Sequence, residues 1–131
     1  MNLSAEIKGK IQAIATKHGL EFAVLFGSQA TGRIHARSDV DIAVISRQPV
    51  NIDRLAMEFS EALGRDDVEV VDLSRSSPTL MRQVVLEGKL LYEKSFGGFF
   101  AWKIYAIKVW METAWLRDLG KKKLMEWAGQ S

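Results

Sequence analysis

The residues best suited to chemistry in this sequence are a pair of aspartates in an apolar segment. Asp39 and Asp41 are separated by a single residue. If the segment is a strand, both carboxylates project from one face, with Cα atoms about 6–7 Å apart. Such a pair can bracket two metal ions ~3.5–4 Å apart, an arrangement that activates an attacking oxygen and stabilises a leaving one. Oxygen ligands without His or Cys favour Mg²⁺ or Mn²⁺ over zinc.

A third carboxylate lies in the apolar segment 68–73. Alternation along a strand places Glu69 on one face with Asp67 and Val71. A charged side chain between valines is costly to bury unless it has a partner. We therefore predict that Glu69 is the third metal ligand, whereas Asp72, at the strand end, is expected to cap the next turn.

The expected phosphate-binding element is the pair Gly27 and Ser28, directly after the apolar run 20–26. Where a buried strand ends, backbone N–H groups are free to face a ligand, and glycine allows a phosphate to approach closely. The Ser28 hydroxyl can donate to the same oxygens. Neither the Walker A pattern nor the Gly-x-Gly-x-x-Gly pattern of dinucleotide sites occurs in the chain.

The elements that must position these residues alternate between helices and strands. Hydrophobic periodicity, capping residues and turn residues predict helices over 4–18, 51–63, 78–87 and 99–128, a short turn or helix over 29–32, and strands over 20–26, 39–46, 68–73 and 89–92. This order predicts an α/β fold in which helices pack on a small mixed sheet. The pair Gly97 and Gly98 is the expected linker between a catalytic unit, residues 1–98, and a helical tail, residues 99–131.

The tail differs from the rest in composition. Of 131 residues, 47% are hydrophobic and 26% charged, with net charge +2, but residues 99–131 carry six basic and three acidic side chains and all four tryptophans. Two apolar stripes run along the predicted helix: Phe100, Ile104, Ile107, Met111 and Trp115, and Trp102, Tyr105, Ala106, Val109 and Leu116. Two stripes imply burial on two sides, either within this domain or against a partner.

The motif resembles that of a known family. Gly27-Ser28, ten intervening residues and Asp39-x-Asp41 match the signature of the minimal nucleotidyltransferase (MNT) domain, in the DNA polymerase β-like superfamily. The resemblance covers roughly residues 18–93. It implies the nucleotidyltransferase fold, a site for two Mg²⁺ ions and ATP as substrate. The family usually has Asp where this chain has Glu69, which reaches about one methylene further.

Small MNT proteins of this size resemble the antitoxins of HEPN–MNT toxin–antitoxin pairs. This resemblance implies AMPylation of a tyrosine on a HEPN ribonuclease toxin, held through the helix 99–128. Two alternatives remain: an MNT-fold antitoxin that neutralises its partner by binding alone, and a nucleotidyltransferase acting on a small molecule or an RNA end. The chain has no cysteine, no apolar run of the ~20 residues that cross a bilayer and no strong net charge. We therefore expect a cytoplasmic protein that does not bind nucleic acid directly. The helical tail could also support a homo- or hetero-oligomer.

Overall fold

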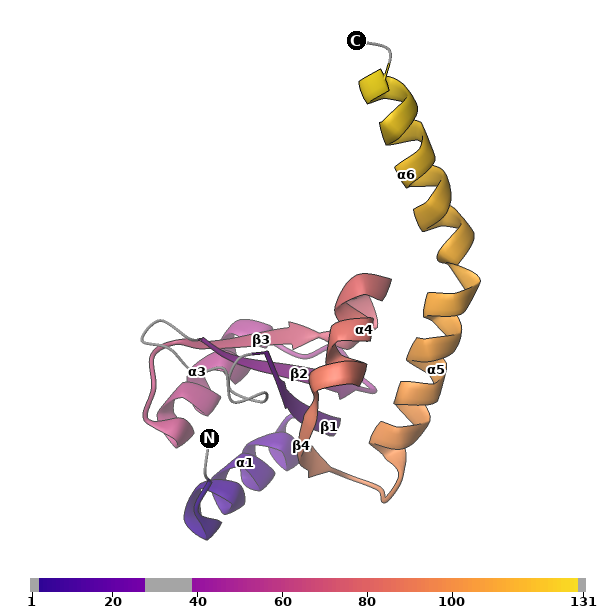
Figure 1. Cartoon of the computed structure of the whole chain (residues 1–131). Helices are drawn as coiled ribbons and strands as arrows, with labels where there is room; N and C mark the ends of the chain where they lie inside the picture. The colour runs from indigo at the N-terminus through magenta and orange to yellow at the C-terminus, as the bar shows by residue number, and fades with distance from the viewer. Residues whose placement is uncertain (1–2, 28–38, 130–131) are drawn as a thin grey trace.

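The chain forms a mixed sheet with helices on both faces, as seen in a computed structural model that describes residues 3–27 and 39–129 (Figure 1). The predicted turn over 29–32 and Ser28 lie outside the described residues. The helices are α1 (Ala5–Lys17), α3 (Ile52–Leu63), α4 (Pro78–Glu87), α5 (Gly98–Glu112) and α6 (Ala114–Gly129), with a 3-10 turn, η1 (Leu73–Arg75). The strands are β1 (Leu20–Phe26), β2 (Val40–Ser46), β3 (Val68–Asp72) and β4 (Lys89–Glu93).

Capping residues set the helix boundaries where the sequence predicts them. The side chains of Ser4, Asn51 and Ser77 each accept a hydrogen bond from a backbone N–H in the first turn of the following helix. These bonds satisfy donors that a helix start otherwise leaves unpaired. Gly64 ends α3 in the left-handed conformation, with φ +66°. Asp72 caps η1 as predicted, accepting hydrogen bonds from the backbone and hydroxyl of Ser74.

The strands are ordered β3-β2-β1-β4, so the two central strands are β2 and β1. β1 is antiparallel to β2 and to β4, whereas β2 and β3 are parallel. The start of β2, the start of β3 and the end of β1 therefore meet at one edge of the sheet. Because α4 leads directly into β4, the end of that helix lies at the same edge.

Each face of the sheet has its own core. Val40, Ile42 and Val44 point to the face covered by α1 and α3, and Ala43 points to the face covered by α4 and α5. This alternation along β2 is the predicted one. The core on the α4–α5 face includes three aromatic residues in mutual ring contact, Phe22, Phe99 and Trp102.

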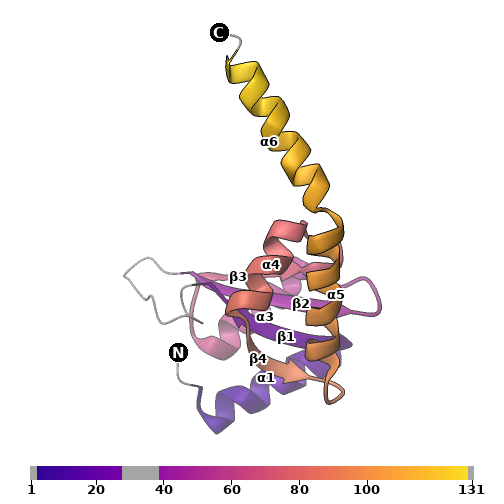
Figure 2. The ribbon, with the colours of Figure 1, turned by 45° about the vertical axis from the view of Figure 1, so that its right-hand side comes forward.

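The predicted helix over 99–128 is present as two helices that meet at Thr113. The Thr113 hydroxyl donates to the carbonyl oxygens of Val109, at 2.7 Å, and Trp110, at 3.3 Å. Such bonds from a side chain back to the preceding turn bend helices. α5 lies beside α4, and α6 continues away from the sheet (Figures 1 and 2). Among residues 3–27 and 39–129, no helix combines the length and apolar character needed to span a membrane.

Candidate active site

Asp39 and Asp41 lie at the start of β2, at the sheet edge where β1 ends. Asp39 directly precedes the strand and is exposed, and Asp41 is its second residue and is half-buried. Because Val40 and Ile42 enter the core on the α1–α3 face, strand alternation places Asp41 on the opposite face, toward α4. The buried residues of β2 thus fix the backbone from which the Asp41 carboxylate projects toward α4.

Glu69 is paired directly with Asp41 across the parallel strands β2 and β3. The negative charge of Glu69 therefore acts on the Asp41 carboxyl at short range. Val68 and Val70, on either side of Glu69, contact the core of the opposite face, so the predicted alternation along β3 is correct. The Glu69 side chain is nevertheless exposed. Burial therefore does not force a partner on Glu69, contrary to the prediction, because β3 is an edge strand and leaves this side chain open to solvent.

Gly27 ends β1 next to Asp41, in the left-handed conformation with φ +79°. Its neighbour Phe26 is paired with Asp41 in the β1–β2 ladder. The backbone N–H of Gly27 donates to the carboxylate of Glu87, with 3.1 Å between N and Oε2. The predicted phosphate-binding glycine therefore lies beside the predicted metal ligands, whereas its companion Ser28 is outside the described residues.

Glu87 is a residue at this edge that the sequence reasoning did not identify. It is the last residue of α4, and the following strand β4 begins by pairing Lys89 with Leu25 near the end of β1. This pairing returns the chain to Gly27 after sixty residues. The sequence shows a glutamate before a helix-ending glycine, but only the strand order reveals that it reaches the site.

The carboxylates crowd one another at this edge. The pKa of Asp41 is raised from 3.8 to about 6, first by burial and then by the negative charge of Glu69. The charges of Asp39 and Glu87 raise the pKa of Asp41 further. Like charges in a partly desolvated place disfavour ionisation, and a bound cation reverses that preference.

The donor set fits a hard divalent cation. Asp39, Asp41 and Glu69 provide only carboxylate oxygens, the ligands that Mg²⁺ prefers. No group of three His, Cys, Asp or Glu side chains in the described parts of the chain is already arranged to hold a metal ion. A Mg²⁺ ion shared by Asp39, Asp41 and Glu69 would require their side chains to move closer together, and two of the three, Asp39 and Glu69, are exposed.

Comparison with known proteins places these features in context. Residues 9–96 match the family described as polymerase beta, nucleotidyltransferase. Protein adenylyltransferase MntA of Shewanella oneidensis is 43% identical over 76 residues, which are 56% of this chain and 54% of the relative. The chain therefore spans about half the length of that curated relative.

Two solved structures resemble nearly the whole chain. One is a toxin–antitoxin with AMP-PNP, with a TM-score of 0.76 and 28% identity, covering 90% of this chain and 98% of the matched chain. The other is a tri-AMPylated Shewanella oneidensis HEPN toxin in complex with MNT antitoxin, with a TM-score of 0.71 and 26% identity, covering 91% and 96%. Because only residues 1–98 precede the tail, a 90% match must extend into residues 99–131.

Proposed function

Because this chain belongs to the polymerase β nucleotidyltransferase family, we propose that it is a Mg²⁺-dependent protein adenylyltransferase acting as an antitoxin. It transfers AMP from ATP to a tyrosine of a cognate HEPN-type ribonuclease toxin. The observation that carries this proposal is the placement of Asp41 opposite Glu69, beside the Gly27 turn. A cytoplasmic location is part of the same proposal.

The reaction is a displacement at the α-phosphorus of ATP. The tyrosine oxygen forms a bond to that phosphorus, the bond to the β-phosphate oxygen breaks, pyrophosphate leaves and the phenolic proton is released. Asp39, Asp41 and Glu69 would hold Mg²⁺, which would supply positive charge to polarise the phosphate oxygens and to lower the cost of the charge that develops in the transition state. The backbone of Gly27 faces the phosphates, where the missing side chain permits close approach.

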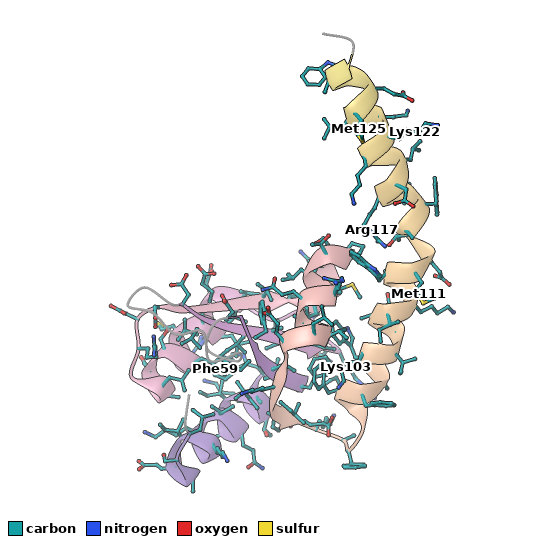
Figure 3. All side chains as sticks on the ribbon, viewed as in Figure 1. Phe59, Lys103, Met111, Arg117, Lys122 and Met125 are labelled. Carbon is teal, nitrogen blue, oxygen red and sulfur yellow. The ribbon has the colours of Figure 1, made fainter. Side chains whose placement is uncertain are left out.

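The partner is proposed to be held by α5 and α6. The stripe Phe100, Ile104, Ile107, Met111 and Trp115, here called the outer stripe, is exposed along its whole length. Within the second stripe, Trp102 and Ala106 are buried in the domain core. Only one side of α5 is therefore covered by the domain, and the uncovered side has the apolar and aromatic character enriched at protein interfaces. Figure 3 shows Met111 on the side of α5 that faces away from the sheet.

Modification by AMP would silence a ribonuclease by charge and bulk. It adds a negative phosphodiester and a nucleoside beside a site that must accept an anionic RNA.

The second candidate function is neutralisation of the toxin by binding alone. The outer stripe also favours this candidate, because a docking surface works without catalysis. The chain 1–98 leaves few residues for an acceptor pocket, so an acceptor presented by a partner suits it better than a small molecule.

The deciding experiment combines the purified protein with labelled ATP, Mg²⁺ and a purified HEPN partner. We expect label on a tyrosine of the partner, located by mass spectrometry, and none with Asp39→Asn. If Asp39→Asn still neutralises a partner that stays unmodified, binding alone is the mechanism. If label appears on neither the partner nor any other protein, the adenylyltransferase assignment fails.

A further inference from the structure

Glu87 lies beside the site and has no role in the proposed reaction. Its Oε2 atom accepts hydrogen bonds from the backbone N–H of Gly27, at 3.1 Å, and from the side-chain amide of Gln83, at 3.2 Å. The first donor belongs to the turn that the proposed function assigns to the nucleotide phosphate. A carboxylate of this chain thus occupies the donor that the proposed function assigns to the substrate.

Two of the described features disfavour a negative charge on the Glu87 side chain. Glu87 is the final residue of α4, where the helix dipole presents its negative end. Its charge also acts on the partly buried carboxyl of Asp41. Gly27 and Gln83 are two donors that help to hold the carboxylate against these repulsions. A hydrogen bond to an ionised group is roughly twice as strong as one between neutral groups, so the Gly27 amide is firmly engaged.

We propose that Glu87 is an internal competitor of the nucleotide phosphate at the Gly27 amide, and that it sets the nucleotide affinity of this site. The proposal rests on the proposed function. One N–H group donates one strong hydrogen bond, and a carboxylate and a phosphate repel each other at that distance. The phosphate must therefore displace Glu87, whose side chain is half-buried rather than fully enclosed. Breaking the hydrogen bond between Glu87 and Gly27 therefore lowers the affinity of the site for the nucleotide.

Two variants separate competition from a simple effect of charge. Glu87→Gln keeps the size of the side chain but replaces a charged acceptor by a neutral one. Glu87→Asp keeps the charge but shortens the side chain by one methylene, so that it no longer reaches the Gly27 amide. Competition predicts tighter binding in both variants. Charge alone predicts tighter binding in Glu87→Gln and wild-type affinity in Glu87→Asp.

The measurement is calorimetric titration with a non-hydrolysable ATP analogue in Mg²⁺, and separately with inorganic triphosphate. We expect the affinity of both probes to rise about 5–10-fold in Glu87→Gln, the difference between a charged and a neutral hydrogen bond. A smaller rise is expected in Glu87→Asp. Adenosine, which has no phosphate, should show no change. Glu126→Gln on the distant helix α6 removes the same charge and should leave all affinities unchanged.

Two results would overturn the proposal. Wild-type affinity in Glu87→Asp would reduce the effect to charge, and weaker binding with a lower melting temperature in Glu87→Gln would make Glu87 a structural support of the Gly27 turn. Failure of the proposed function is distinguishable, because wild-type protein would then show no Mg²⁺-dependent binding of the analogue at all. If wild type and Asp41→Asn differ as expected but the Glu87 variants match wild type, only the competition is wrong.

Discussion

Gly27 and the carboxylate of Asp41 are so close that no side chain fits between them. A Cβ atom placed on Gly27 would lie 2.6 Å from Oδ2 of Asp41, and φ at Gly27 is +79°. The absence of a side chain at position 27 therefore serves two purposes, since it permits the left-handed turn and leaves space for the carboxylate.

Gly27→Ala should accordingly lower both stability and transfer activity. The strained backbone costs about 1–2 kcal/mol in the free energy of unfolding, and the new methyl group pushes the Asp41 carboxylate out of position. Urea unfolding and the labelled-ATP assay measure the two effects. Gly64→Ala is the matched control, because Gly64 has φ +66° but nothing within 4 Å of a new Cβ atom. It should show the stability loss with full activity, and equal activity in both variants would contradict the placement of Asp41 in the site.

Asp41→Asn should abolish AMP transfer while stabilising the metal-free protein. The substitution removes a metal-ligand charge, and it also removes the repulsion that the other carboxylates exert on Asp41. With EDTA at pH 7, we expect a gain of about 1–2 kcal/mol in the free energy of unfolding, reduced from the full pKa effect because Asp41 is partly exposed. Mg²⁺ should raise the melting temperature of the wild type and not of Asp41→Asn. Asp39→Asn should also lose transfer, but with little stability gain, because Asp39 is exposed.

Glu69 is predicted to be the third metal ligand, and three substitutions test this role. Glu69→Gln should weaken both the Mg²⁺ dependence and the activity, since an amide oxygen carries no charge. Glu69→Asp should be tolerated or improved, because Asp is usual at this position in the family it resembles. Glu69→Asp should change the free energy of unfolding by less than about 0.5 kcal/mol, as expected for an exposed residue that keeps its charge. An unaltered Mg²⁺ titration in Glu69→Ala would exclude Glu69 from the metal site.

The strands and helices that carry this site could be predicted from the sequence, but not all of the residues that lie in it. Strand boundaries followed from apolar runs that end at glycine or at a charged residue, and helix starts followed from capping residues such as Ser77. These signals are local. Glu87 was missed because its proximity to Gly27 depends on the pairing of β4 with β1, which local patterns do not encode. The break at Thr113 was missed for a related reason, since a threonine hydroxyl can either face solvent or bond to its own helix.

The contact between α1 and α3 should respond to pH through Glu58. Its carboxylate binds Lys17, the last residue of α1, and His18, the C-cap residue that follows. The hydrogen bond from Lys17, followed by that from His18, lowers the pKa of Glu58 below its usual 4.5. A depressed pKa in an acid adds stability above the unfolded value and loses it as pH falls through the folded value. Wild type should therefore lose its advantage over Glu58→Gln below pH 4.5, by about 1 kcal/mol or less. Glu61→Gln, an exposed acid on the same helix, should show no such difference.

The predicted partner helix, 99–128, is partly buried in the domain core, so only its uncovered side can serve as the partner surface. Phe99, Trp102 and Ala106 belong to the domain core, so a truncation before Phe99 would remove core residues and unfold the domain. A truncation after Thr113 removes only α6, none of whose described residues is buried. Arg117 fixes the start of α6, because its guanidinium stacks on the Trp110 ring at 3.3 Å and donates to the Trp110 carbonyl at 2.7 Å.

The last prediction is that the outer stripe of α5 holds the HEPN partner independently of catalysis. In the double variant Ile104→Gln and Met111→Gln, partner affinity should fall at least about 10-fold, since two large side chains that are 54% and 70% exposed in the free protein would lose their burial. ATP-analogue binding and the melting temperature should not change, because neither residue supports the core. Lys108→Gln, exposed on the same helix but outside the stripe, is the control. Pull-down and calorimetry with a purified partner measure the binding. Wild-type affinity in the double variant would exclude the outer stripe as the interface, whereas an equal loss in Lys108→Gln would mean that charge rather than apolar burial holds the partner.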